Sequence, residues 1–125
     1  MELSPGRYQP ILIKAHPWPN IQEHYADLVN SGWHLQPMLE LVTHIIASDL
    51  RTRLFAFASL DGLIISIYDP IERNREALHL KFDHFHQKWL FEYYPKPNHP
   101  VEWRREYPTD QGIEKFENFI RLNKW

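Results

Sequence analysis

The sequence predicts a single α+β domain over residues 1–125, in which an antiparallel sheet of about five to six strands carries two or three helices mainly on one face. Apolar and polar residues alternate in successive stretches between 54 and 107, and a period of two is typical of strands. Over 21–31 and 110–123, apolar residues recur at spacings of three and four, which predicts amphipathic helices. We therefore expect two hairpins, a following strand and a C-terminal helix that ends the chain.

The first elements are predicted to be a strand and a helix. Residues 8–14 have the composition of a short strand, and Pro10 restricts it to a sheet edge or to its first residues. Asn20 is a favourable N-cap for a helix over 21–31, because its side chain accepts hydrogen bonds from the first-turn amides. Gly32 stands where a helix commonly ends on a left-handed glycine, so we expect the helix to end there.

Residues 37–48 carry signals for both kinds of secondary structure. Pro37 suits a first helical position, and the residues that follow it, 38–41, are good helix formers. Val42 and Ile45 are β-branched and favour a strand. We predict a helix buried on more than one side. If the segment is a strand instead, the sheet gains a member and the fold class is unchanged.

The first hairpin is predicted from Asp61-Gly62, because a two-residue type I′ turn needs positive φ at both of its central positions. This turn pairs Ala58 with Ile65 and Ala56 with Ile67. One face of the hairpin is then apolar: Leu54, Ala56, Ala58, Leu60, Leu63, Ile65 and Ile67. The opposite face carries Phe55, Phe57, Ser59, Ile64, Ser66 and Tyr68. We expect helices to cover the first face, and a partner or the chain ends to cover the second.

A second hairpin is predicted to close over residues 84–87. Its apolar pairs are Phe82 with Trp89, Leu80 with Phe91 and Leu78 with Tyr93, and its polar-face pairs are Asp83 with Lys88, Lys81 with Leu90 and His79 with Glu92. Opposite charges that meet in this register support it. The strand 101–107 extends the sheet by pairing Tyr93 with Trp103 and Trp89 with Tyr107. We expect Thr109 to cap the final helix over 110–123.

This register brings three polar residues into one row across adjacent strands: His79, Glu92 and Arg104. A carboxylate between an imidazole and a guanidinium would keep its charge, raise the pKa of the histidine and orient its ring. His79 would then be a general base, Glu92 its orienting carboxylate and Arg104 the anchor for an anionic substrate. The competing interpretation is a solvated sheet face with ordinary cross-strand pairs.

Two other groups of residues have the chemistry of a site. Asp83, His84 and His86 are suited to a divalent metal, but no further ligand stands at a diagnostic spacing, so we expect no metal and no cofactor. The aromatic residues of the later strands are suited to stacking on bases, although the same period of two is what a sheet buries under a helix: Trp89, Phe91, Tyr93, Trp103 and Tyr107. We expect these residues to form core.

Composition narrows the classes of function. The chain has no cysteine, which excludes thiolate catalysis and disulfides, and it contains no glycine-rich phosphate loop. With a net charge of −2, we expect no nucleic-acid partner, and with no long apolar run we expect no membrane span. Residues 1–10 lack the features of a secretory signal, which favours a cytoplasmic location.

Two functions follow from these observations. The first is a small soluble non-catalytic binding or accessory protein, of immunity or regulatory type, that acts through a protein interface with a partner or as a homodimer. The missing catalytic motifs, the two-sided apolar hairpin and an aromatic content of 14% all favour it. The alternative is an enzyme or small-ligand binder that uses His79, Glu92 and Arg104 in a cleft beside the sheet.

Overall fold

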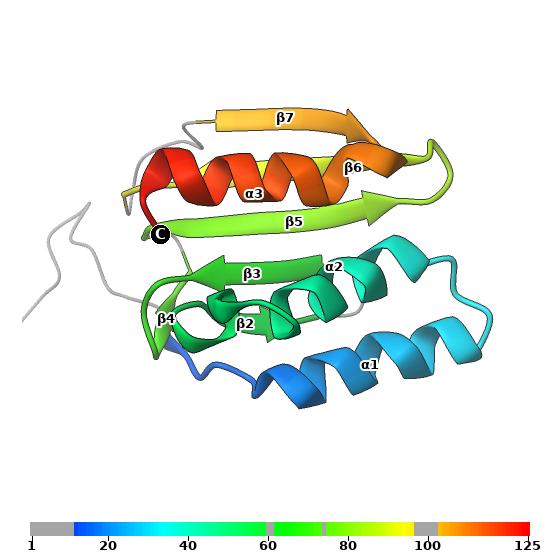
Figure 1. Cartoon of the computed structure of the whole chain (residues 1–125), viewed down its shortest axis with the longest axis horizontal. Helices are drawn as coiled ribbons and strands as arrows, with labels where there is room; N and C mark the ends of the chain where they lie inside the picture. Colours follow the sequence, from blue (N-terminus) through cyan, green and yellow to red (C-terminus); the bar gives the residue numbers. More distant parts are fainter. Residues whose placement is uncertain (1–11, 60–61, 74, 97–102) are drawn as a thin grey trace, which may run out of the picture.

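The computed structural model describes residues 12–59, 62–73, 75–96 and 103–125 (Figure 1). Its described strands form a five-stranded antiparallel sheet in the order β2-β3-β5-β6-β7. These strands are β2 (Phe55–Ala58), β3 (Gly62–Ser66), β5 (Ala77–Asp83), β6 (Lys88–Tyr94) and β7 (Trp103–Pro108). A separate two-stranded ribbon pairs β1 (Leu12–Ile13) with β4 (Ile71–Glu72). Of the predicted strand 8–14, residues 12–13 form β1, Lys14 lies beyond its end, and residues 8–11 lie outside the described part.

The helices of the described residues lie on one face of this sheet. They are α1 (Trp18–Asn30), α2 (Gln36–Ile46) and α3 (Gly112–Asn123), with short 3₁₀ turns η1 (Asp49–Thr52) and η2 (Thr109–Gln111). In Figure 1, α2 lies in front of β2 and β3 with α1 beside it, and α3 lies in front of β5 to β7. The predicted α+β class and the C-terminal helix are confirmed.

One hydrophobic core fills the space between the helices and the sheet. Its helical residues include Ile21, Tyr25, Met38, Leu41, Val42, Ile45, Phe116, Phe119 and Ile120. Its sheet residues include Ala56, Ala58, Leu63, Ile65, Leu78, Leu80, Phe82, Trp89 and Phe91. Each fully buried large apolar side chain stabilises the fold by roughly 1.5–3 kcal/mol relative to exposure. Ala56 and Ala58 of β2 are buried in this core, on the face that the sequence predicts to be covered by helices.

Helix α1 begins earlier than predicted. Its first residue is Trp18, with Pro17 in the N-cap position, and the Pro17 carbonyl accepts from the amide of Asn20 at 3.0 Å. Asn20 therefore lies inside the first turn, and the predicted cap at this residue is wrong. Proline is favoured in the first turn of a helix, because an amide at that position would have no acceptor within the helix. Pro19 occupies such a position in α1. Trp18 is buried, and its indole donates to the Leu54 carbonyl at 3.0 Å.

The end of α1 confirms the prediction for Gly32. This glycine has φ of +95°, and its amide donates to the Val29 carbonyl at 3.0 Å. The amide of Trp33 donates to the Leu28 carbonyl, also at 3.0 Å. These two bonds form a Schellman motif, which requires one left-handed residue and so favours glycine.

The helix predicted over 37–48 is confirmed as α2, which begins one residue earlier and ends at Ile46. Leu41, Val42 and Ile45 are fully buried, so tertiary packing stabilises the β-branched residues in a helix. Thr43 donates its hydroxyl to the Leu39 carbonyl at 2.8 Å, which satisfies the side chain within the helix.

The register of the first hairpin differs from the prediction by two residues. Ala58 pairs with Leu63 and Ala56 with Ile65, and the Ser59 amide donates to the Gly62 carbonyl at 2.9 Å. Gly62 belongs to β3 and has no positive φ, so the predicted Asp61-Gly62 turn is wrong. The two residues between Ser59 and Gly62 lie outside the described part. A two-residue shift keeps every side chain on its predicted face, because the side-chain period of a strand is two.

The second hairpin and β7 confirm the predicted registers. The structure pairs Phe82 with Trp89, Leu80 with Phe91, Leu78 with Tyr93, Asp83 with Lys88, Lys81 with Leu90 and His79 with Glu92. In β7, Trp103 pairs with Tyr93 and Tyr107 with Trp89. Residues 101–102 of the predicted strand lie outside the described part. In the order of the five-stranded sheet, β6 therefore lies between β5 and β7.

The start of the last helix corrects another predicted cap. Residues 109–111 form η2 and α3 begins at Gly112, so Thr109 does not cap it, and its hydroxyl oxygen is buried without a partner in the described part of the chain. The Thr109 carbonyl instead accepts from the indole of Trp89 at 3.0 Å. A Cβ at Gly112 would lie 2.3 Å from Trp89 Nε1. Close contact with this indole therefore fixes where α3 meets the sheet.

Candidate functional site

The candidate site is the face of the five-stranded sheet opposite the helices, which no helix of the described residues covers (Figure 1). We call it the helix-free face and define it by Ile64, His79, Lys81, Leu90, Glu92, Arg104 and Glu106. In β5 and β6 their neighbours along the strand are mostly core residues, and the β7 residues Arg104 and Glu106 pair with Glu92 and Leu90, so the alternation of the strands places all of them on the outer side. The three residues of the predicted row all lie on this face.

Glu92 and Arg104 pair across β6 and β7 as predicted. Arg104 donates from Nε to Glu92 Oε2 at 2.7 Å, and Nη2 donates to the same oxygen. The Arg104 side chain is 61% exposed and that of Glu92 18% exposed. Arg104 thus binds the carboxylate from the solvent side, and its guanidinium is already engaged within the chain.

His79 stands opposite Glu92 in the register, but no hydrogen bond joins the two side chains in the described structure. Its Nε2 donates to the Arg73 carbonyl at 2.9 Å, and its ring lies 4.4 Å from that of Tyr94, measured between centroids. Burial lowers the pKa of His79, and this effect exceeds the opposing effect of Glu92. The expected rise in this pKa is therefore wrong: the imidazole is held neutral, with its proton on Nε2.

A groove follows β5 and β6 along the helix-free face. Its first part is a hollow of about 230 Å³, lined by Ile64, His79 and Glu92 among others. Lys81 and Leu90 line both this hollow and a second one of about 470 Å³. The second hollow reaches Trp33 and Leu35 in the loop between α1 and α2, and Phe85 in the turn between β5 and β6. We call the two hollows together the sheet groove.

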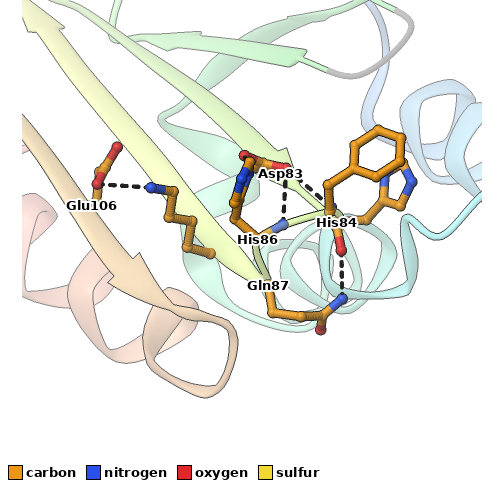
Figure 2. Close-up of polar contacts among 7 residues, drawn as sticks. Asp83, His84, His86, Gln87 and Glu106 are labelled. Carbon is orange, nitrogen blue, oxygen red and sulfur yellow. Dashed lines mark hydrogen bonds and ion pairs between the residues drawn. The ribbon is translucent and has the colours of Figure 1, made fainter.

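The turn at the end of the sheet groove is fixed by Asp83 (Figure 2). One carboxylate oxygen accepts from the backbone amides of Phe85 at 3.0 Å and His86 at 3.2 Å, and the other contacts His86 Nδ1 at 2.7 Å. The hydrogen bond from His86 lowers the pKa of Asp83. Gln87 closes the turn by donating to the His84 carbonyl at 2.6 Å. Phe85 is 84% exposed on this ordered turn.

The histidines of this turn have separate contacts. His86 faces Asp83, whereas the His84 ring lies 4.0 Å from the Phe85 ring and 5.3 Å from the His34 ring. Among the described residues, no three His, Asp or Glu side chains come together as metal ligands. The arrangement instead brings the rings of His34, His84 and Phe85 together in tilted contacts beside the larger hollow.

Charge on the strands of the helix-free face and at its turn end is balanced. The cations there are Lys81, Lys88 and Arg104, and the anions are Asp83, Glu92 and Glu106, while Arg73 adds one cation from the segment before β5. Lys88 donates to Glu106 at 3.0 Å, which adds a second cross-strand ion pair to that of Glu92 and Arg104 (Figure 2). The strands of this face therefore have no surplus of cations for the phosphates of a nucleic acid.

The aromatic residues of the later strands belong to the core, as expected. Trp89 and Phe91 are buried, and Tyr93, Trp103 and Tyr107 pack against the core beneath α3. Of the aromatic residues predicted on the opposite face of the first hairpin, Tyr68 is exposed and Phe55 is half-buried. The site predicted from the sequence did not include Lys81 and Leu90. The alternation of the strands could have found them, because it places both on the same face as His79. It had no signal for Arg73 or Trp33, which come from connecting segments.

Fold and face together define a small α+β protein with helices on one side of an antiparallel sheet and a grooved, charge-balanced surface on the other. No family model, curated protein or solved structure matches the chain. In the described residues, every helix is too short or too polar to cross a membrane.

Proposed function

We propose that this chain is a small non-catalytic binding or accessory protein, of immunity or regulatory type, that acts through a protein interface on the helix-free face. The observation that carries the proposal is the sheet groove, which runs across an uncovered sheet face. Half-buried Ile64 and Leu90 lie along it, and ion-paired residues surround them. A partly apolar centre with a polar rim is the usual anatomy of a protein interface.

The size of the hollow beside His79 favours a protein over a small ligand at that part of the groove. The hollow beside His79 has about 230 Å³, which is below the roughly 300–1,000 Å³ typical of small-molecule pockets. The larger hollow is shaped partly by Phe85 and Trp33, which are 84% and 44% exposed. Exposed aromatic side chains beside a hollow are frequent anchors of protein interfaces.

The partner that we assign to this face is a second copy of the chain. Three cations and three anions at alternating positions suit a surface with the same balance, and a two-fold contact supplies one. Phe85 also stands beside the hollow of about 470 Å³, so in a two-fold pair each copy offers both a protruding ring and a place to receive one. The resulting dimer would bury the groove on both copies.

Sedimentation equilibrium of three purified chains tests this proposal. The wild type is expected to sediment at about twice the chain mass of 15.1 kDa at micromolar concentration. Leu90→Glu places a carboxylate in the centre of the face and should weaken association by about 100-fold or more. Leu122→Glu is the matched control, because Leu122 is exposed on α3 on the other side of the sheet. A monomeric wild type, or equal effects of the two variants, would overturn the proposal.

The alternative function is a small-ligand binder or enzyme that uses His79, Glu92 and Arg104. One observation favours it: a neutral His79 lines a hollow together with Arg73 and Lys81, and a neutral imidazole accepts a proton. A ligand screen by thermal shift tests it with wild type, His79→Ala and Arg104→Ala. A ligand that stabilises only the wild type would support the alternative, and a screen without such a ligand would count against it.

We also propose a cytoplasmic location. The absence of cysteine from the sequence is in keeping with it, since disulfides are common in small secreted proteins. Fractionation of cells that express a tagged chain tests this, and recovery from the periplasm or the medium would contradict it.

A further inference from the structure

A third cavity lies on the helix side of the sheet, away from the helix-free face. It has about 530 Å³, within the range of small-molecule sites, and opens between β7 and α3. Its walls include Trp103 and Tyr107 from β7 and Phe119 from α3. The Trp103 ring centroid lies 5.9 Å from that of Phe119 and 6.4 Å from that of Tyr107. Flat aromatic surfaces from two elements therefore meet around one opening.

Several hydrogen-bond donors line this cavity, and three of them make no hydrogen bond in the part of the chain that the structure describes. Lys115 Nζ lies 5.4 Å from the Tyr107 ring centroid and 3.9 Å from Glu114 Oε2, which is too far for a hydrogen bond. Within the described residues, no hydrogen bond is made by the Trp103 indole, the Tyr107 hydroxyl or the Asn118 amide. Burial raises the pKa of Tyr107, so its hydroxyl keeps its proton at neutral pH.

These donors select for a ligand with acceptors and negative charge. An ammonium, an indole N–H, a phenol and a carboxamide all donate, and the ammonium adds a full positive charge. Aromatic walls favour a planar apolar group, because rings stack or meet edge to face. We propose that the cavity between β7 and α3 is a binding site for a flat aromatic carboxylate, with its ring against Trp103 and Phe119 and its carboxylate toward Lys115.

The test is an NMR titration of the ¹⁵N-labelled chain with phenylacetate and, in parallel, with phenylacetamide. The two probes have the same ring and nearly the same size but differ in charge. Saturable shifts are expected at the Trp103 indole and the Asn118 amide with phenylacetate. Because a charge-assisted hydrogen bond is stronger than a neutral one, phenylacetate should bind about tenfold more tightly than the amide.

Matched charge variants identify the contact. Lys115→Met should remove the difference between the two probes, whereas Lys124→Met, which removes a cation outside the cavity, should preserve it. Leu90→Glu on the helix-free face should leave phenylacetate binding unchanged, so this proposal and the dimer fail independently. Absence of saturable shifts, equal affinity of the two probes for the wild type, or an unchanged preference in Lys115→Met would overturn the inference.

Discussion

Arg104 and Glu92 form a cross-strand ion pair, in which Arg104 Nε donates to Glu92 Oε2 at 2.7 Å. Because of this pair, the Glu92 side chain faces β7. His79 pairs with Glu92 from β5, but its ring donates to the Arg73 carbonyl instead. The row therefore contains an ion pair and a separately held neutral imidazole. This arrangement fits a protein interface better than it fits a catalytic site, because Glu92 does not orient the His79 ring.

The first prediction concerns the strength of this ion pair. At concentrations low enough for the chain to be monomeric, a double-mutant cycle with Glu92→Gln and Arg104→Gln should give a coupling energy of about 0.2–1 kcal/mol, because solvent screens the exposed arginine of a single chain. Urea unfolding of the four chains measures it. Coupling well above 2 kcal/mol would show that the pair is shielded from water in a way that the exposure of Arg104 contradicts.

The second prediction concerns pH. Burial lowers the pKa of His79 in the folded chain below its reference value of 6.5, so the unfolded chain binds more protons at this residue as the pH falls through 6.5. His79 therefore contributes stability above this pH that is lost in acid. His79→Gln keeps a donor for the Arg73 carbonyl but does not titrate, so its free energy of unfolding should fall less between pH 8 and pH 5.

NMR titration of the His79 ring measures the same effect directly. We expect a midpoint below 6.5 for the folded chain. A midpoint at or above 6.5 would mean that Glu92 outweighs burial, and the interpretation of a neutral imidazole would have to be abandoned.

The third prediction concerns the contact between α3 and the sheet. A Cβ at position 112 would lie 2.3 Å from Trp89 Nε1, so Gly112→Ala should destabilise the chain by about 1–3 kcal/mol through overpacking. Thermal and urea unfolding measure the loss. Arg121→Ala is the control, because Arg121 is exposed on the same helix and should change stability by about 0.5 kcal/mol or less. Equal effects of the two substitutions would show that α3 does not approach Trp89 so closely.

The fourth prediction concerns the end of α1. Gly32 has φ of +95° and no atom within 4 Å of an added Cβ, so the cost of Gly32→Ala comes from the backbone alone. We expect a destabilisation of about 1–2 kcal/mol. Ser31→Ala, one residue earlier with φ of −89°, should have a much smaller effect in the same unfolding experiment. If Gly32→Ala left the free energy of unfolding unchanged, the left-handed conformation at this position would be contradicted.

The sheet was largely predictable because its faces depend only on the alternation of the strands. The second hairpin has matching apolar and charged pairs in one register, so Asp83 with Lys88 and His79 with Glu92 are placed correctly. The first hairpin lacks charge pairs, and the Asp61-Gly62 signal selected a register two residues away from the observed one. The predicted core was still correct, because both registers put the same side chains on the core face.

Caps and contacts from connecting segments were harder to predict. Thr109 has a side chain suited to capping, but α3 begins three residues later, where glycine permits close contact with Trp89. The partner of His79 is a backbone carbonyl at Arg73, and sequence alternation carries no information on that connection. The cavity between β7 and α3 likewise depends on how a helix docks onto a strand, which is a tertiary property.

Solvent paramagnetic relaxation of side-chain methyl groups tests the central claim, that the helix-free face is the interface, most directly. At concentrations where the chain sediments as a dimer, the methyl groups of Ile64 and Leu90 should be protected from a dissolved paramagnetic probe. Leu12 and Leu122, which are 59% and 74% exposed, should relax strongly under the same conditions. Strong relaxation at Leu90 in the dimer, equal to that at Leu122, would place the interface elsewhere and contradict the account.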